Sequence, residues 1–286
     1  MNNIPNKFLV TTPGISATRW LCFALKTRKN IFVSHGKHPL DSIEHGDFVR
    51  EKNMDDIESC TLGNKTADFY AKSSLSEIFE AYYKIKPDAV AYGNIHAFTI
   101  ESLMQKADTQ EELDGIRIIN VLRHPINYIA SHFSLVKSSV KHPDLFHHYE
   151  KVMMPQAIQQ FPELALFDHV PYLEFMAFAV SCLSVCNLAY DFAYPQFLHV
   201  QMEELTTESI MLKDFCEYLT GQEYSLDELN KLIQLGAINQ HEKNPTSKDP
   251  KEIYESWETW KQDLFHMMIP VSVLSKLQRY GYTIFQ

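Results

Sequence analysis

Five short apolar runs, separated by segments of helical periodicity, constrain the fold of this chain more than any other feature. The runs are KFLVTTP (7–13), NIFVSHG (30–36), DAVAYGNIH (88–96), IRIINVL (116–122) and QFLHVQM (196–202). Each is nearly all apolar, as expected for strands of a parallel sheet that helices cover on both faces. We therefore predict an α/β fold, a three-layer sandwich with a mainly parallel central sheet.

The segments between and after these runs predict the helices. They lie at 16–27, 74–85, 99–113, 126–139 and 207–221, with helical insertions in 140–195 and helices at the end of the chain. Ser74 with Glu77 forms a capping box, and Gly221 is a typical helix end. The 286-residue chain has no Pro/Gly/Ser-rich linker and no internal repeat, so we expect residues 1–286 to form a single domain.

Charge and cysteine content bear on the partners and on the location. The net charge of -10 argues against a nucleic-acid surface but is compatible with a local basic pocket for a small anion. Five cysteines, mostly in apolar runs, indicate reduced, buried thiols and an intracellular location. Cys182 and Cys186 have the spacing of a metal pair on a helix, but no second pair completes a site. We therefore predict core packing for this pair and no metal.

Neither a leader nor a membrane span is expected. The opening segment MNNIPNKFLV lacks the apolar core of a signal peptide, which favours a cytoplasmic location. The most apolar segment, FMAFAVSCLSVCNLAY (175–190), is shorter than the roughly 20 residues that span a bilayer, so we predict a buried helix there.

Three of the predicted strands end in residues suited to binding or catalysis. Ser16 to Arg19 follow the first strand, His96 ends the third and Arg123 follows the fourth. Ligands of parallel sheets bind at the carboxyl ends of the strands. These residues therefore predict a ligand site at that edge of the sheet.

The first of these strand ends has the features of an anion site. The turn Thr11–Gly14 leads into a helix, whose first backbone N–H groups can bind an anion. Ser16 and Thr18 add hydroxyl groups. Arg19 stands in the first helical turn, where the helix dipole disfavours a cation, so either a bound phosphate or sulfate offsets its charge or its side chain points into water. The segment lacks the G-x-x-x-x-G-K-S/T and G-x-G-x-x-G motifs of nucleotide-binding loops.

Two segments resemble the nucleotide-binding motifs of sulfotransferases, which use PAPS (3′-phosphoadenosine 5′-phosphosulfate). SATRWL (16–21) resembles the S-G-T-T-W-L loop that binds the 5′-phosphosulfate. INVLRHPINYIASHFSL (119–135) resembles the second motif, in which an Arg at a strand end and a Ser eight residues later hold the 3′-phosphate. Arg123 and Ser131 fit that spacing, and Pro125 fits the usual proline between them.

Two later segments continue the resemblance in chain order. Residues 197–221 look like the strand, acidic pair and long helix of the family, and residues 259–282 look like its C-terminal ending. The resemblance implies a P-loop-like phosphate-binding turn, PAPS as the donor, 3′,5′-ADP as the product and no metal. It also implies acceptor-side segments at 36–70 and 136–195, and a lid with C-terminal helices at 239–286.

The resemblance also assigns nucleotide-binding roles to individual residues. They are Ser16, Ala17, Thr18, Arg19 and Trp20 of the loop, Arg123 and Ser131 of the second motif, and the lid lysines Lys243 and Lys248. Arginine offers a planar fork of donors that suits phosphate oxygens. Trp20 matches the aromatic residue that stacks on adenine, although a Trp on an apolar helix face can also belong to the core.

The loop departs from the family pattern at several positions. Ile15 stands where a basic residue usually touches the phosphosulfate, Ala17 replaces a glycine and Arg19 replaces a hydroxyl residue. We expect Arg19 to supply the missing charge from a shifted position. Met202 replaces the tyrosine that many relatives carry before the acidic pair, so the packing of adenine would differ.

A histidine at a strand end is the candidate general base. Histidine suits this role because its ordinary pKa lies near neutrality. His96 lies in NIHAF (94–98), which resembles the K-T-H-L-P segment that bears the catalytic histidine of cytosolic-type sulfotransferases. The chain has 13 histidines, so one at a strand end can also be incidental. Glu101 and His35 are the next candidates, and His124 would only line the pocket.

These observations predict a PAPS-dependent sulfotransferase that transfers a sulfuryl group to a hydroxyl or amine by in-line displacement. The alternatives are a weak or inactive sulfotransferase-like protein that binds nucleotide, and another P-loop transferase or kinase. The acceptor would be a small molecule, a carbohydrate or a lipid. The aromatic-rich segment 136–195 would line its pocket, or belong to the core or to a homodimer surface. Trp257 and Trp260 are expected to anchor the helix that follows them.

Overall fold

The chain divides into two compact units in the computed structural model. The first contains the residues up to Leu122 and Tyr194–Asn239, and the second contains Arg123–Ala193 and the residues from Gln240 onward. The structure describes residues 5–35, 38–39, 70, 72–107, 110–235 and 249–283. The expectation that residues 1–286 form one domain stays a prediction.

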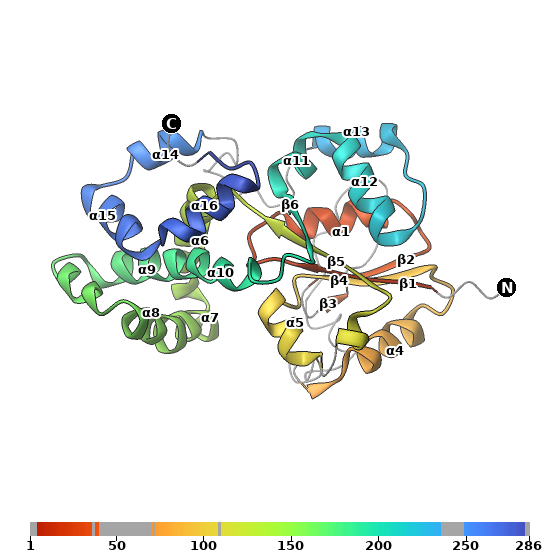
Figure 1. The fold of residues 1–286 in the computed structure, drawn as a ribbon, viewed down its shortest axis with the longest axis horizontal. Helices are drawn as coiled ribbons and strands as arrows, with labels where there is room; N and C mark the ends of the chain where they lie inside the picture. Colours follow the sequence, from red (N-terminus) through yellow and green to blue (C-terminus); the bar gives the residue numbers. More distant parts are fainter. Residues whose placement is uncertain are drawn as a thin grey trace. The chain divides into compact units, whose positions relative to one another are not determined.

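A six-stranded sheet is the centre of the first unit (Figure 1). Its strands are β1 (Asn6–Thr11), β2 (Ile31–His35), β3 (His38–Pro39), β4 (Ala91–Ile95), β5 (Ile116–Leu122) and β6 (Leu198–Gln201). They lie in the order β3-β2-β4-β1-β5-β6; β3 pairs antiparallel with β2, and all other neighbours pair in parallel. The five apolar runs are the five parallel strands, so the predicted sheet is confirmed.

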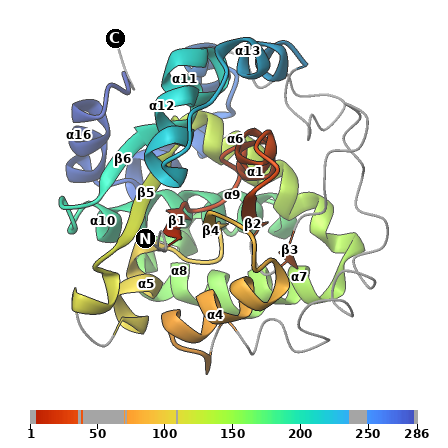
Figure 2. The same ribbon diagram turned by 90° about the vertical axis from the view of Figure 1, so that its right-hand side faces the viewer.

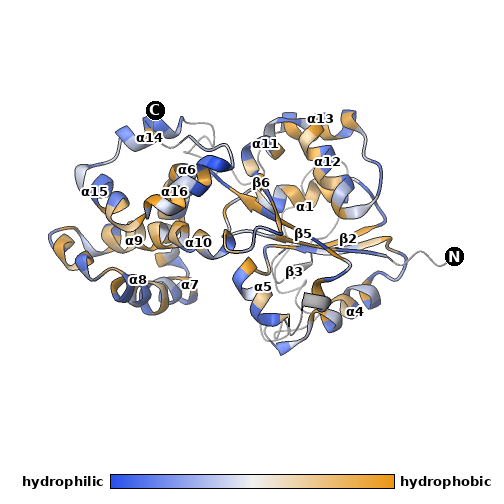
Figure 3. Cartoon of the chain, viewed as in Figure 1, coloured by the Kyte–Doolittle hydropathy of each residue, from blue (hydrophilic) through white to orange (hydrophobic). Residues whose placement is uncertain are grey.

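Helices cover both faces of this sheet (Figures 1 and 2). One face carries α1 (Thr18–Lys26), α11 (Met202–Thr207), α12 (Ser209–Thr220) and α13 (Leu226–Leu235), and the other carries α4 (Leu75–Ile85) and α5 (Ile100–Lys106). In β1, Phe8 and Val10 belong to the core on the first face, whereas Leu9 belongs to the core on the second. The helices on each face pack on the sheet through one of these cores, so helices, sheet and helices make the three predicted layers. The strands are mostly hydrophobic (Figure 3).

Local sequence signals set several element ends as predicted. The Ser74 hydroxyl accepts from the Glu77 backbone N–H at 3.2 Å, and the Glu77 carboxylate accepts from the Ser74 backbone N–H at 2.8 Å, which is the capping box of α4. Gly221 ends α12 in the left-handed conformation, with φ at 68°. The helix predicted over 99–113 is instead α5 followed by a short 3-10 helix at Gln110–Leu113.

The described residues of the second unit form helices and their connecting loops, with no strand among them. Its helices are α6 (Pro125–Ser138), α7 (Pro143–His148), α8 (Met154–Gln160), α9 (Tyr172–Cys186), α10 (Leu188–Asp191), α14 (Pro250–Glu255), α15 (Thr259–Met268) and α16 (Val271–Arg279). Rings of Trp257 and Trp260 lie 5.1 and 5.6 Å from the ring of Phe178, which is buried in α9. These contacts fix the start of α15 on α9, so the predicted anchoring is confirmed.

The helix α9 is the apolar centre of the second unit. Every residue from Met176 to Cys186 is buried, as predicted for a core helix. The helical segment that contains the predicted run 175–190 extends over Tyr172–Asp191 and is 20 residues long, longer than the run itself. By length and composition it could cross a membrane, but 72% of its apolar window is buried inside the structure.

Candidate functional site

The carboxyl ends of β1 and β4 diverge into opposite layers of the first unit. After β1 the chain crosses to β2 through α1 on one face, and after β4 it crosses to β5 through α5 on the other face. Adjacent strands whose connections leave in opposite directions open a crevice at their carboxyl ends, which is where ligands bind on open parallel sheets. The β1–α1 turn and His96 both lie at this point.

The β1–α1 turn holds an unusual backbone conformation. Gly14 has φ at 96°, and Ile15 and Ala17 have φ at 54° and 52°, which L-residues with a Cβ rarely adopt. The Gly14 N–H donates to the Thr12 hydroxyl at 3.2 Å, and the Ser16 hydroxyl donates to the Gly14 carbonyl at 3.0 Å. Such strained positions persist where the surroundings hold them, and they concentrate at functional sites.

His96 lies against this turn. It also has a positive φ, at 76°, and its backbone N–H donates to the Val10 carbonyl at 2.9 Å. A Cβ placed on Gly14 would lie 3.0 Å from the His96 Cε1 atom, so the glycine allows the imidazole to approach the turn closely. The Asn94 side chain supports the segment that follows, because its Oδ1 accepts from the Ala97 backbone N–H at 2.8 Å.

The surroundings of His96 favour its neutral form. Burial lowers the pKa of His96 below its usual range, and a hydrogen bond to the Thr12 backbone opposes that shift in part. The Nδ1 atom of His96 is buried and makes no hydrogen bond within the described part of the chain. A neutral imidazole carries a lone pair on one of its two nitrogens and can accept a proton there.

A second histidine stands beside this ring. His35, at the end of β2, lies with its ring centroid 5.9 Å from that of His96. Its Nε2 is 2.8 Å from the Thr18 hydroxyl in the first turn of α1. The structure thus brings together the predicted base, one of its two alternatives and one predicted loop residue. The other alternative, Glu101 on α5, accepts a 3.3 Å hydrogen bond from Gln105.

The remaining predicted loop residues have different surroundings. Ser16 is completely buried, and its hydroxyl is used within the turn. Ala17 precedes α1 and makes no side-chain cap, and no acidic residue stands in the first turn of that helix, where half-buried Arg19 lies. Trp20 is 3% exposed and packs in the core beside the sheet, and Met202 is buried in the same core. Packing between sheet and helices therefore accounts for Trp20 without a nucleotide.

The second-motif residues belong to the second unit. Arg123 follows β5 directly and is buried, and Ser131 lies half-buried on α6. His124 is the residue before α6; its Nε2 lies 3.2 Å from the Thr283 carbonyl, and its ring packs edge-on against Tyr282 at 5.5 Å. His124 thus connects α6 to the end of the described chain. The predicted lid lysines, Lys243 and Lys248, lie outside the described residues.

One polar group at the sheet was missed from the sequence. The Thr11 hydroxyl, at the end of β1, donates to Asn120 Oδ1 on β5 at 3.0 Å, and Asn120 Nδ2 lies 3.1 Å from His199 Nδ1 on β6. These side chains link three neighbouring strands near the turn. The signal was a polar residue inside an otherwise apolar strand, which costs free energy unless it is hydrogen-bonded.

Metal-ligating groups do not gather in the part of the chain that the structure describes. Among those residues no three His, Cys, Asp or Glu side chains lie close enough to hold a metal ion. The four described cysteines are free and buried, and burial raises the pKa of the Cys186 thiol to about 12. Cys186 donates to the Met268 carbonyl, which fits the predicted role in core packing.

Comparison with known proteins finds similar solved structures but no matching family model and no matching curated protein. A sulfotransferase from Alicyclobacillus acidocaldarius is 15% identical, with 98% of this chain and 97% of that chain covered and a TM-score of 0.45. A mouse sulfotransferase complexed with PAP is 15% identical, with 97% and 88% covered and a TM-score of 0.46. The sulfotransferase domain of the curacin biosynthetic pathway is 12% identical, with 99% and 100% covered and a TM-score of 0.46.

Proposed function

We propose that this protein is a PAPS-dependent sulfotransferase. It transfers a sulfuryl group to a hydroxyl or amine of a small-molecule, carbohydrate or lipid acceptor in the cytoplasm, and 3′,5′-ADP is the second product. The proposal combines the motif resemblance at 16–21 and 119–135 with the site at the ends of β1 and β4.

One observation carries the proposal, which is the state of His96. Its ring lies against the strained β1–α1 turn, burial lowers its pKa, and its Nδ1 makes no hydrogen bond to any described residue. Buried polar atoms in native proteins are normally satisfied, so an unsatisfied imidazole atom beside a strained turn is compatible with a ligand partner. In our proposal the His96 imidazole takes the proton of the acceptor hydroxyl.

The start of α1 fits the anionic end of PAPS. Its first backbone N–H groups receive no side-chain cap, its first turn holds no acidic residue, and Arg19 adds a positive charge. A helix start with these features favours a bound phosphate or sulfate. PAPS supplies the activated sulfuryl group, and we assign the 3′-phosphate to Arg123 and Ser131 on the strength of the motif alone. Because Trp20 is buried, we assign it no contact with adenine.

The test measures turnover and nucleotide binding separately. The protein is incubated with radiolabelled PAPS, with and without panels of phenols, sugars and hydroxylated lipids, and released 3′,5′-ADP is quantified. We expect His96→Asn to abolish turnover while it leaves the affinity for 3′,5′-ADP within about twofold. Arg19→Met and Arg123→Met should each weaken 3′,5′-ADP binding by about tenfold or more, since a hydrogen bond to a charged group contributes roughly 1.5–3 kcal/mol. His147→Asn, an exposed change on α7, is the matched control.

Ile15 favours a second candidate, a nucleotide-binding protein without catalysis. It places an apolar residue in the turn where the family has a basic one, so the charge at the transferring group would be reduced. Tight binding of 3′,5′-ADP without turnover on any acceptor would support this candidate and contradict the first. ATP-dependent labelling of an acceptor would instead indicate another transferase or a kinase.

A further inference from the structure

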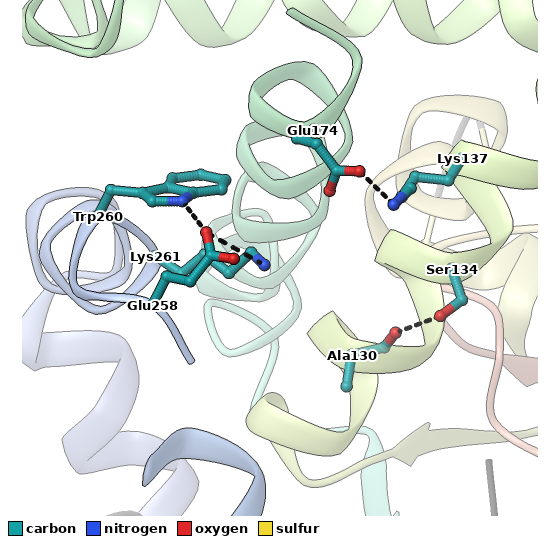
Figure 4. Close-up of polar contacts among 7 residues, drawn as sticks. All are labelled: Ala130, Ser134, Lys137, Glu174, Glu258, Trp260 and Lys261. Atoms are coloured by element: carbon teal, nitrogen blue, oxygen red, sulfur yellow. Dashed lines mark hydrogen bonds and ion pairs between the residues drawn. The ribbon is translucent and has the colours of Figure 1, made fainter. Parts of the chain in front are cut away.

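A cavity of about 420 Å³ that opens to solvent lies in the second unit, between α6 and the starts of α9 and α15. Its volume is within the range of small-molecule sites, about 300–1,000 Å³. None of its lining residues belongs to the proposed nucleotide site. Figure 4 shows its charged side chains: Lys137 of α6 meets Glu174 of α9, and Lys261 and Trp260 of α15 lie beside Glu258.

Two ammonium groups in this cavity lie against one aromatic ring. Lys137 Nζ is 5.1 Å and Lys261 Nζ is 5.0 Å from the ring centroid of Phe133. Lys261 Nζ is also 5.1 Å from the ring of Trp260. Aromatic faces attract cations but offer them no hydrogen-bond acceptor of ordinary strength. The rings therefore position these charges and leave their N–H groups to other partners.

The two lysines differ in whether a carboxylate accepts a hydrogen bond from their ammonium group. Lys137 forms a hydrogen-bonded ion pair with Glu174. Lys261 Nζ is 3.9 Å from Glu258 Oε2, which is beyond hydrogen-bond distance, and that oxygen already accepts from the Trp260 indole N–H. The Lys261 side chain is only 15% exposed, so water solvates it poorly. Lys261 is thus a largely buried cation without a hydrogen bond to any residue that the structure describes.

We propose that this cavity binds a small organic monoanion, a ring that carries one carboxylate or sulfate ester group. The anionic group accepts charge-assisted hydrogen bonds from Lys261, and the ring packs against Phe133 and Trp260. Two lysines and two glutamates sum to zero charge, which favours a monoanion over a polyphosphate. The proposal is independent of the proposed function.

Titrations with matched probes test this proposal. Benzoate and phenyl sulfate carry the two anionic groups, and benzyl alcohol is the neutral analogue with the same ring. The chain has three tryptophans, so the indole N–H region of a nitrogen–proton correlation spectrum is simple, and Trp260→Phe assigns the signal of the cavity. We expect one or both anions to shift the Trp260 signal saturably, and benzyl alcohol to bind at least tenfold more weakly. The anion that binds more tightly identifies the preferred group.

Charge variants locate the binding at the cavity. Lys261→Met should weaken the anion by about tenfold or more, whereas Lys261→Arg should keep most of the affinity. Lys151→Met is the matched control, because Lys151 pairs with Glu150 at 3.0 Å outside the cavity. Thermal melting followed by circular dichroism checks that each variant is folded. Absence of a saturable shift, equal binding of benzyl alcohol, or unchanged affinity in the folded Lys261→Met protein would overturn the proposal.

Discussion

His132, buried on α6, makes the stability of the second unit depend on pH in a direction that can be calculated. Its ring centroid is 5.5 Å from those of both Tyr128 and Tyr149, and its Nδ1 lies 3.1 Å from the Ser181 hydroxyl. Because that hydroxyl donates to the Ala177 carbonyl at 2.7 Å, its oxygen accepts from the His132 Nδ1–H. Burial lowers the pKa of His132 from 6.5 to about 4.

The sign and size follow from the two pKa values. Between pH 6.5 and 4 the unfolded chain takes up a proton on His132 and the folded protein does not. The free energy of unfolding therefore falls as the pH falls through this window, and the contribution of His132 is fully present only above pH 6.5. The interval of about 2.5 pKa units, at about 1.4 kcal/mol per unit, corresponds to about 3.5 kcal/mol, of which about 3 kcal/mol is lost by pH 4.

The assay compares His132→Gln with the unmutated protein. Urea unfolding is followed by circular dichroism at half-unit steps from pH 4 to 7.5. We expect the variant to lose about 3 kcal/mol less than the unmutated protein over this range, because glutamine does not titrate. His147→Gln, an exposed change on α7, should leave the original profile in place.

Two results would refute this reasoning. One is a pH profile for His132→Gln that runs parallel to that of the unmutated protein. The other is a His132 imidazole that titrates near pH 6.5 in the folded state when it is followed by NMR. Either result would mean that the histidine is hydrated enough to be protonated in place, and that burial does not hold it neutral.

Three further predictions rest on single positions of the first unit. In Gly93→Ala the new Cβ would lie 2.2 Å from two atoms of the fully buried Phe8 ring, so we expect a loss of about 1–3 kcal/mol in urea unfolding; unchanged stability would contradict this overpacking. Because the pKa of His96 is lowered, the proposed base is neutral at pH 7, so the rate of sulfuryl transfer should be flat near neutrality and fall only below pH 6.5. A midpoint above 6.5 would exclude His96 as the group that titrates. Ser74→Ala removes the cap of α4 and should cost about 0.5–2 kcal/mol by the same urea assay, whereas Ser74→Asp should retain most of it.

The five parallel strands could be predicted from the sequence because a strand that is buried on both faces is nearly all apolar. The run at 116–122 coincides with β5, and the run at 88–96 contains β4, with residues 88–90 and His96 placed wrongly in the strand. Local hydrogen bonding made the start of α4 equally plain. In contrast, β3 has two residues, too few for any periodicity to mark it.

The candidate site was predictable by position and less so by chemistry. Topology alone places Thr18 and His96 at neighbouring strand ends. Nothing in the identity of Ile15 or Ala17 signals a left-handed backbone, because tertiary contacts impose it. Trp20 could not be assigned from sequence, since an aromatic residue that stacks on a ligand and one that fills a core occupy the same helical face.

The position of β6 in the chain has a consequence for synthesis on the ribosome. This strand pairs with β5, yet residues 123–197, of which 123–193 belong to the second unit, are made between the two. Until β6 emerges, one edge of β5 has no partner strand and is open to pairing with another nascent chain. The sheet can therefore be completed only late in translation. A truncation before residue 198 would leave that edge permanently open, so we expect such fragments to aggregate rather than to accumulate as a smaller folded protein.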